Sequence, residues 1–200
     1  MASGKTSVIR TRVYPEFARM SYLVYGLIIS IAVFFVGALL AFAGRFLLAG
    51  EPIPPVTVPV EFYWSTLFLL GGSHFLFRSY RAIRLERQSQ FRIWLLLSVV
   101  LATVFCVLQT IGMSSLLDQH WQGAASEART PIALLLMVFL HIAHFGAGFL
   151  GLVYVTVLGF RGRYDHEFHN GVRLAAIYWR FLDIIWMIVL LLIIWLSVPA

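Results

Sequence analysis

Residues 131–160 read PIALLLMVFLHIAHFGAGFLGLVYVTVLGF, an apolar run without a single Asp, Glu, Lys or Arg. A transmembrane helix needs about 20 apolar residues, because each residue adds about 1.5 Å and the hydrocarbon core is about 30 Å thick. This run exceeds that length, so a helix built from it can cross the bilayer at a tilt. Pro131 stands at the first helical position, where its missing N–H is tolerated. The run therefore predicts a membrane-spanning helix over residues 131–160.

Four further apolar runs have the same character, and they cover residues 21–43, 60–77, 93–113 and 174–198. Hydrophobic residues make up 60% of the chain and charged residues only 12%, whereas a soluble domain carries about 25% charged residues. The segment 51–59 holds four prolines and cannot be helical throughout. We therefore predict an all-α membrane protein. Residues 21–200 are expected to form one domain of five transmembrane helices behind an N-terminal tail, residues 1–20.

The Lys and Arg residues lie almost entirely on one side of this predicted bundle. The N-terminal tail holds four, the segment 78–92 five and the segment 161–173 three, whereas the opposite side holds only Arg45 and Arg129. Cytoplasmic loops of membrane proteins carry such an excess. The N-terminus is therefore expected inside the cell and the C-terminus outside.

Arg78, Arg81 and Arg84 are spaced to form a basic stripe on an extension of the second helix. Such a stripe is typical of contact with anionic lipid headgroups, and a docking face for a soluble partner is the alternative. The net charge of +6 comes from basic blocks beside apolar spans, so nucleic acid is not an expected partner. The single cysteine, Cys106, lies inside an apolar run and excludes a disulfide framework within the chain.

Among the ionisable residues inside the predicted spans, the informative ones are His74, His141, His144, Arg180 and Asp183. Such groups are costly in a bilayer and usually face protein or water. His144 and Asp183 fall near the same depth of two antiparallel helices, so we hypothesise a hydrogen bond between them. Arg180 is three residues before Asp183 and could neutralise it in a local ion pair.

Three interpretations of the histidines remain open. A zinc site needs three or four convergent ligands, and His141 with His144 supplies only two, because His166 and His169 lie about 20 Å or more away. Haem ligation would pair His74 with His141 or His144. Hydrogen bonding between helices, which fixes their register, needs no cofactor. We favour this last interpretation and predict no catalytic, metal-binding or cofactor-binding residue.

The last two predicted spans carry an ordered set of polar, small and aromatic residues. His141, His144 and Gly148 form the pattern H-x-x-H-x-x-x-G. The last span then contributes His169, Gly171, Ala175, Ala176, Tyr178, Trp179, Phe181, Asp183 and Trp186. In this order and spacing the chain resembles subunit III of the haem-copper oxidases, the cytochrome c oxidase subunit III family, in its short five-helix bacterial form.

The resemblance extends upstream to about residue 60 with weaker matches and with departures. The weaker matches are Ser65, Thr66, Leu101, Phe105 and Gln109. Three positions depart from the family pattern. Gly112 stands where the family has a glutamate, Arg173 where it often has a glutamate, and Arg180 where it has a histidine. A lipid or proton role assigned to the first of these carboxylates therefore has no counterpart here.

The resemblance implies a non-catalytic subunit of a terminal oxidase in aerobic respiratory electron transport, in a bacterial cytoplasmic (inner) membrane. Such a chain carries no redox centre, because haem and copper belong to the partner subunits I and II. It packs against subunit I, holds phospholipid, and supports assembly and proton uptake. Small subunits and a supercomplex with a quinol-oxidising complex are further partners that the resemblance implies.

Four alternatives remain. One, in the same superfamily, is the similarly short subunit-III-like protein that accompanies nitric-oxide reductases. A purely structural scaffold is another, and it merges with the leading interpretation. A di-haem cytochrome b membrane anchor would use the intramembrane histidines as haem ligands. A small transporter would show inverted repeats with broken midplane helices, and the sequence shows neither sign.

Overall fold

The computed structural model describes residues 15–44, 57–122, 132–164 and 169–197. These residues form five helices, which confirms the all-helical prediction. The helices are α1 Pro15–Ala43, α2 Val60–Arg84, α3 Gln88–Gln122, α4 Ile132–Phe160 and α5 Asn170–Ser197. The structure leaves residues 1–14, most of the proline-rich segment 51–59, and Arg45, Arg129, Pro131 and His166 outside its described part.

Four of the five helices contain a stretch long and apolar enough to cross a membrane. These stretches are Ser21–Ala43, Gln88–Gln119, Leu135–Phe160 and Asn170–Trp195. The remaining helix, α2, contains no stretch of comparable hydropathy. Its apolar residues alternate with Glu61, a Gly-Gly pair, His74 and three arginines. A span over residues 60–77 therefore stays a prediction.

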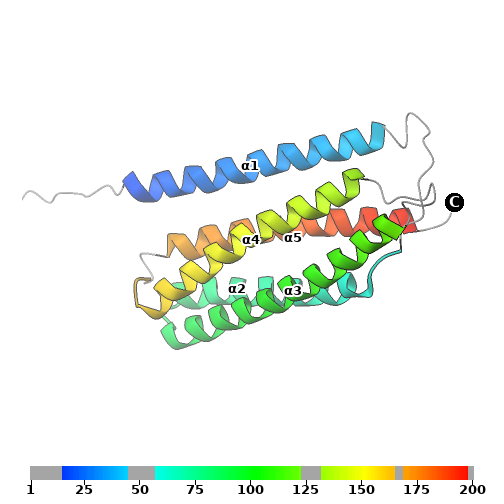
Figure 1. The fold of residues 1–200 in the computed structure, drawn as a ribbon. Coiled ribbons are helices and arrows are strands. Elements are labelled where there is room, and N and C mark those ends of the chain that lie inside the picture. The colour runs from blue at the N-terminus through cyan, green and yellow to red at the C-terminus, as the bar shows by residue number, and fades with distance from the viewer. Residues whose placement is uncertain (1–14, 45–56, 123–131, 165–168, 198–200) are drawn as a thin grey trace, which may run out of the picture.

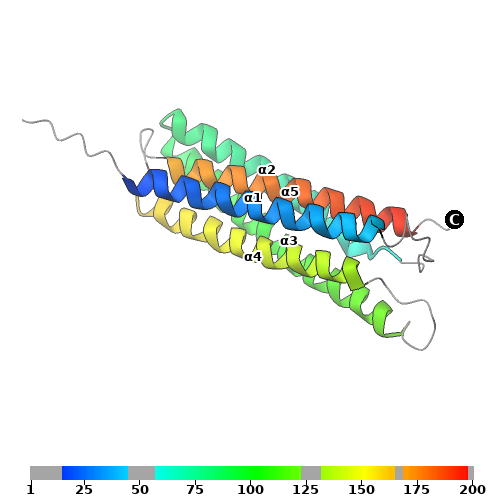
Figure 2. The same ribbon diagram turned by 90° about the horizontal axis from the view of Figure 1, so that it is seen from above.

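The helices α2, α3, α4 and α5 form a four-helix bundle, in which each packs against its two neighbours around a closed ring. Figures 1 and 2 show these helices running side by side, with α1 lying along α4 and α5 on the outside. Over residues 21–43, where the structure describes the burial of α1, most of its surface is exposed and the buried residues are Ile31, Phe35 and Phe42. The core therefore sits inside the four-helix ring, and α1 adds only one contact stripe.

Helices α2 and α3 end beyond their predicted spans. The extension of the second helix that carries Arg78, Arg81 and Arg84 is confirmed, because α2 runs to Arg84, and α3 already begins at Gln88. The third predicted span ends at residue 113, whereas α3 continues to Gln122. Hydropathy detects where a helix leaves the hydrocarbon and not where it ends, because polar residues propagate a helix well in water.

The same end of the bundle has two matching helix terminations. At the end of α2, Glu86 adopts a φ of 59°, and the Arg87 N–H donates to the Ala82 carbonyl at 3.0 Å. At the end of α4, Gly162 adopts a φ of 69°, and the Arg163 N–H donates to the Leu158 carbonyl at 3.0 Å. Both are Schellman motifs, in which a left-handed residue lets the chain reverse immediately. They make the short turn into α3 and start the return toward α5.

Gly148 sets the closest approach of α4 to α5. A Cβ atom at this position would lie 2.6 Å from Cε1 of Tyr178 and 2.9 Å from Cδ1 of Leu182. Both of these side chains are buried, so neither can move freely. Small residues at helix crossings allow such approach in membrane proteins.

We expect Gly148→Ala to destabilise the bundle by about 1–3 kcal/mol, because it overpacks the α4–α5 contact. Gly151→Ala is the matched control, since a Cβ there meets no atom within 4 Å. The free energy of unfolding, measured by denaturant titration in detergent, checks this. Equal stabilities of the two variants would contradict the close-packing argument.

Candidate functional site

The centre of the four-helix bundle is organised around the indole of Trp186 on α5. Its Nε1–H donates to Oγ1 of Thr66 on α2 at 2.9 Å, and the Thr66 hydroxyl donates in turn to the Phe62 carbonyl at 2.7 Å. The Phe62 ring meets the indole edge to face at a centroid distance of 5.2 Å. Each polar side-chain atom of Thr66 and Trp186 therefore has a hydrogen-bond partner inside the apolar core.

A second polar link joins α2 to α3 beside the first. Gln109 Nε2 donates to Oγ of Ser65 at 3.4 Å, and the Ser65 hydroxyl donates to the Phe62 carbonyl at 3.0 Å. All three residues are buried. The weak upstream match Gln109 thus lies beside the matches Ser65 and Thr66 in the structure, although it is 44 residues from Ser65 in the sequence.

His141 completes this centre from α4. Its ring is fully buried and stacks on Trp186 at a centroid distance of 5.1 Å and an interplanar angle of 29°. Among the described residues, neither ring nitrogen of His141 has a hydrogen-bond partner, and Oε1 of Gln109 has none either. We name the residues Ser65, Thr66, Gln109, His141 and Trp186 the central polar cluster.

His144, one turn further along α4, lies in a different environment. Its Nδ1 is 2.7 Å from the Leu140 carbonyl, and its ring meets Phe35 of α1 at 6.3 Å. Its own carbonyl accepts a hydrogen bond from the Tyr178 hydroxyl at 3.0 Å. His141 therefore faces the bundle centre, whereas His144 faces α1.

Asp183 is buried on α5, and its carboxyl group lies beside the Ser73 side chain of α2 and interacts with it. Its Oδ1 has no hydrogen-bond partner among the described residues. The hypothesised hydrogen bond between His144 and Asp183 is therefore wrong. The two residues were matched in depth, but they point to opposite neighbours, His144 toward α1 and Asp183 toward α2.

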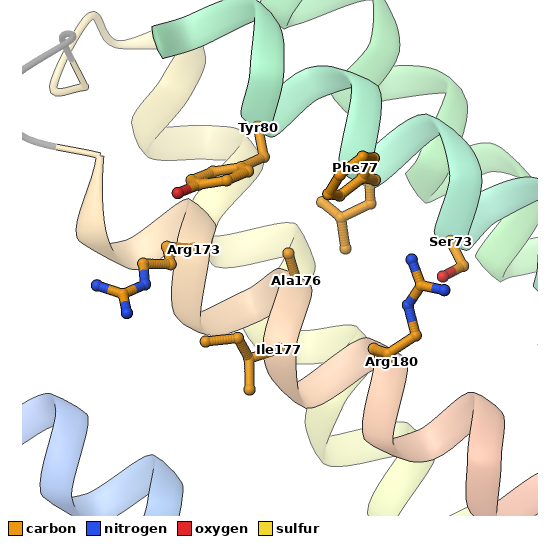
Figure 3. A pocket seen from close by; sticks show the side chains of 8 residues that line it. Ser73, Phe77, Tyr80, Arg173, Ala176, Ile177 and Arg180 are labelled. Carbon is orange, nitrogen blue, oxygen red and sulfur yellow. The ribbon is translucent and has the colours of Figure 1, made fainter.

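Arg180 lies exposed on α5, one turn before Asp183. Its charge acts on the Asp183 carboxyl group, but its guanidinium reaches toward Ser73 of α2 (Figure 3). It helps to line an open cavity of about 330 Å³ between α2 and α5, which we name the α2–α5 groove. The groove is lined by Ser73, Leu76, Phe77, Tyr80, Arg173, Ala176, Ile177 and Arg180.

The residues expected to face lipid headgroups form a row on the exposed surface of α2. Arg78 places its guanidinium carbon 5.4 Å from the centroid of the Trp94 ring. Arg81 and Arg84 lie similarly over the rings of Phe77 and Tyr80, at 5.5 Å and 5.8 Å. Arginine guanidinium groups bind the faces of aromatic rings electrostatically. Each arginine is thus held against α2 or α3 while its charge stays at the surface.

The remaining residues of the sequence motif are spread along α5. Trp179 is buried against Phe145 at 5.1 Å. Gly171 lies under the ring of Tyr164, the His169 ring is 5.7 Å from Tyr80, and Phe181 packs half-buried against the core. His74 is exposed on α2, away from the enclosed His141. Within the described residues, His, Cys, Asp and Glu side chains form no group of three or more that could hold a metal ion.

A second cavity, of about 650 Å³, opens between α1, α4 and α5. Small residues of α4, Ala147, Gly148 and Gly151, leave this space open beside α1. Tyr164 lies at its polar end, in the turn before α5. Burial, with the Tyr154 phenol as a smaller cause, raises the pKa of Tyr164 to about 12. Its phenol is therefore neutral throughout the physiological pH range.

No protein-family model matches the chain. A cytochrome c oxidase subunit 3 of Thermostichus vulcanus is 29% identical over 189 residues, covering 90% of this chain and 88% of that protein. The chain is similar to a cytochrome c oxidase subunit 3. This similarity is distant, but it runs along nearly the whole of both chains and agrees with the resemblance seen in the last two spans.

The structure also shows how the chain accommodates one departure from the subunit III pattern. A Cβ atom on Gly112 would lie 2.6 Å from Cδ1 of Phe62 and closer still to Cε1. The Phe62 ring thus fills the space beside the α3 backbone where a subunit III glutamate would stand. Phe62 in turn packs on Trp186. The absence of a side chain at Gly112 therefore allows the Phe62 ring to occupy this position.

Some of these contacts were missed from the sequence. Ser73 and Phe62 stand in runs of similar residues, and neither has a distinguishing spacing. The only available signal for the Thr66–Trp186 pair was that each is a polar or amphipathic group inside an apolar span, and such groups need partners. Which residues become the hydrogen-bond partners of Thr66 and Trp186 depends on which helices pack together, and the sequence does not show this.

We expect Thr66→Val to destabilise the protein by about 1–2 kcal/mol, because it leaves the Trp186 N–H unpaired in an apolar core. Thr103→Val is the control. Thr103 is exposed, and its hydroxyl donates only to the Val99 carbonyl of its own helix. The change in the free energy of unfolding in detergent is the measurement. An equal loss of stability in Thr103→Val and Thr66→Val would contradict a stabilising role for the Thr66–Trp186 hydrogen bond.

Proposed function

We propose that this protein is the non-catalytic subunit III of a haem-copper terminal oxidase in a bacterial cytoplasmic membrane. One observation carries the proposal. The sequence similarity to a cytochrome c oxidase subunit 3 covers 90% of this chain and 88% of the relative, so it includes all five helices and not one apolar stretch. Haem and copper then belong to partner subunits, and this chain serves assembly and proton uptake.

The use of the buried polar groups supports this role. Hydrogen bonds of Thr66, Ser65 and Gln109 join α2 to α5 and α3, and Ser73 of α2 faces Asp183 of α5. These groups meet one another across helix interfaces, as in a bundle whose task is to hold a fixed shape. His141 and His74, which a di-haem anchor would use, lie in unlike places, one fully enclosed and the other exposed.

The placement of charges supports a topology with the N-terminus inside. The α2–α3 turn and the end of α4 carry Arg84, Arg87, Arg161 and Arg163, and Figure 1 shows both ends on the same side of the bundle. Arginines gather on the cytoplasmic side of membrane proteins. We infer that α2 crosses the membrane as the fifth span, because it packs along both α3 and α5 and turns its hydroxyl groups inward.

The test is the purification of the tagged full-length chain from native membranes in mild detergent, followed by mass spectrometry of the proteins that come with it. We expect haem-copper oxidase subunits I and II, with small subunits and any quinol-oxidising complex in the same fraction. A nitric-oxide reductase core instead would assign the chain to that reductase. Haem absorption from the chain purified alone would show a haem-binding anchor and overturn the proposal.

We expect Asp183→Leu to lower the yield of co-purified oxidase core severalfold. The change removes the buried polar group that faces Ser73, so α2 loses a polar contact with α5. Asp183→Asn is the control, because an amide keeps the shape and polarity of this side chain. An intact, fully active complex containing the leucine variant would contradict this role for Asp183.

A further inference from the structure

The two walls of the α2–α5 groove repeat at the same interval. Ser73 and Tyr80 on α2 are seven residues apart, and so are Arg173 and Arg180 on α5. Figure 3 shows these walls facing each other, with Arg180 beside Ser73 and Arg173 on the side of Tyr80. Seven residues make almost two helical turns, so each helix presents the same face to the groove at both levels. A third helix laid along the groove presents its side chains at this interval too, whereas a hydrocarbon chain has no such repeat.

Arg180 carries its positive charge within the hydrocarbon depth of the membrane. The 28 residues of α5 span about 42 Å and the hydrocarbon core is about 30 Å thick, so a centred helix extends about 6 Å beyond each boundary. The Cα atom of Arg173 then lies just outside the hydrocarbon, and the Cα atom of Arg180 lies about 9 Å inside it. The exposed Arg180 side chain points across the groove toward Ser73 and not along α5 toward Arg173 (Figure 3). Charged side chains at such a depth are costly and normally pair with an opposite charge.

The described part of this chain does not supply that opposite charge by direct contact. Asp183, one turn further along α5, is buried and faces Ser73, and it forms no ion pair with Arg180. Arg173 likewise has no ion pair and no aromatic ring as a partner among the described residues. The arginines on the outer face of α2 differ in this respect, because each lies over an aromatic ring; they are Arg78, Arg81 and Arg84. The two groove arginines therefore remain open to an external anion.

The level between the two arginines is apolar and open. Ala176 on α5 and Phe77 on α2 line this level. Ala176 has only a methyl group, and small residues let membrane helices approach closely. A helix can therefore reach the floor of the groove between Arg173 and Arg180.

A second copy of this chain does not have the chemistry that this groove requires. At the depth of Arg180 the described helices carry one carboxylate, Asp183, and it is buried. An anionic phospholipid carries its charge at headgroup depth, so it would match Arg173 but place no charge opposite Arg180. The complementary occupant is a helix of another membrane protein that carries acidic side chains at both depths.

We propose that the α2–α5 groove docks one transmembrane helix of a partner protein, which holds two carboxylates seven residues apart against Arg173 and Arg180. The residues between these carboxylates pack on Ala176 and Phe77. This inference rests on the proposed function and names the face and the chemistry of one partner contact. The resemblance to subunit III implies other residue types at positions 173 and 180, so the paired arginines make this contact a feature of this chain.

The test uses the near absence of lysine from this chain. Lys5 is the only lysine in the sequence, so Arg173→Lys and Arg180→Lys each place a single amine in the groove and keep its charge. Each variant complex, in native membranes, is treated with a membrane-permeant carbodiimide, which activates a carboxylate for attack by a contacting amine. We expect each lysine to form an amide with an Asp or Glu of one partner transmembrane helix, and the two acidic residues to be seven apart. Mass spectrometry of the linked peptides measures this.

The matched controls are Arg87→Lys and Arg161→Lys, which place an amine at exposed positions at the same end of the bundle but outside the groove. They should form no amide with a transmembrane helix. Ala176→Phe fills the groove while both arginines remain, and it should lower the yield of the co-purified partner at least fivefold. Ala143→Phe adds the same ring to an exposed position of α4, and its yield should stay within about twofold of the unmodified chain. Helix content and thermal unfolding show that each variant is folded.

Several results would overturn the proposal. An intact complex in which neither groove lysine is linked would leave the groove to lipid, and a link from Arg180→Lys to Asp183 alone would show a local pair. A link to a second copy of this chain would make the groove a homodimer contact, and full partner yield from folded Ala176→Phe would also contradict docking. The proposed function fails separately, through absence of an oxidase core. Amides to a transmembrane helix of some other membrane protein would then still uphold the docking of an acidic helix.

Discussion

The packing of the bundle depends on the need to satisfy the Trp186 N–H inside an apolar core. Thr66 of α2 accepts this hydrogen bond, His141 of α4 stacks on the indole face, and Phe105 of α3 meets its edge at 6.1 Å. One side chain of α5 therefore contacts all three other helices of the ring. In a bilayer, hydrophobicity favours lipid and protein neighbours about equally, so specific polar and steric contacts of this kind decide which helix faces which.

This centre divides the chain into inward and outward surfaces with different chemistry. Ser65 and Thr66 of α2 and Gln109 of α3 turn inward into the central polar cluster. The arginines of α2 turn outward at one end of the bundle, where the guanidinium groups of Arg81 and Arg84 lie over aromatic rings. The α2–α5 groove lies where the two kinds of surface meet, since Ser73 lies beside the buried Asp183 on one side and lines the open groove on the other.

The departures from the subunit III pattern form two physical groups. Gly112 stands where the resemblance to subunit III implies a glutamate, and Phe62 occupies the space beside it. His141 stacks on Trp186 with both ring nitrogens unbonded within the described structure. Arg173 and Arg180 stand where the resemblance implies a glutamate and a histidine, and they place two positive charges on one groove. Residue 112, beside Phe62, thus carries no carboxylate. Positive charge is instead concentrated on the outer faces of α2 and α5.

The sequence alone determined that the chain is helical and which stretches are long and apolar enough to cross a membrane, because a charge-free run of sufficient length has few other stable states in a bilayer. Its prediction for α4, residues 131–160, includes every residue of Ile132–Phe160 and ends at the same residue, since Gly162 follows the helix. The end of α3 needed the structure, because polar residues outside the bilayer continue a helix as readily as they end it. Only the tertiary structure decided the partners of the buried groups. Rise per residue gives the depth of His144 and Asp183, but the rotation of each helix about its axis depends on packing, and it turned these two side chains toward different neighbours.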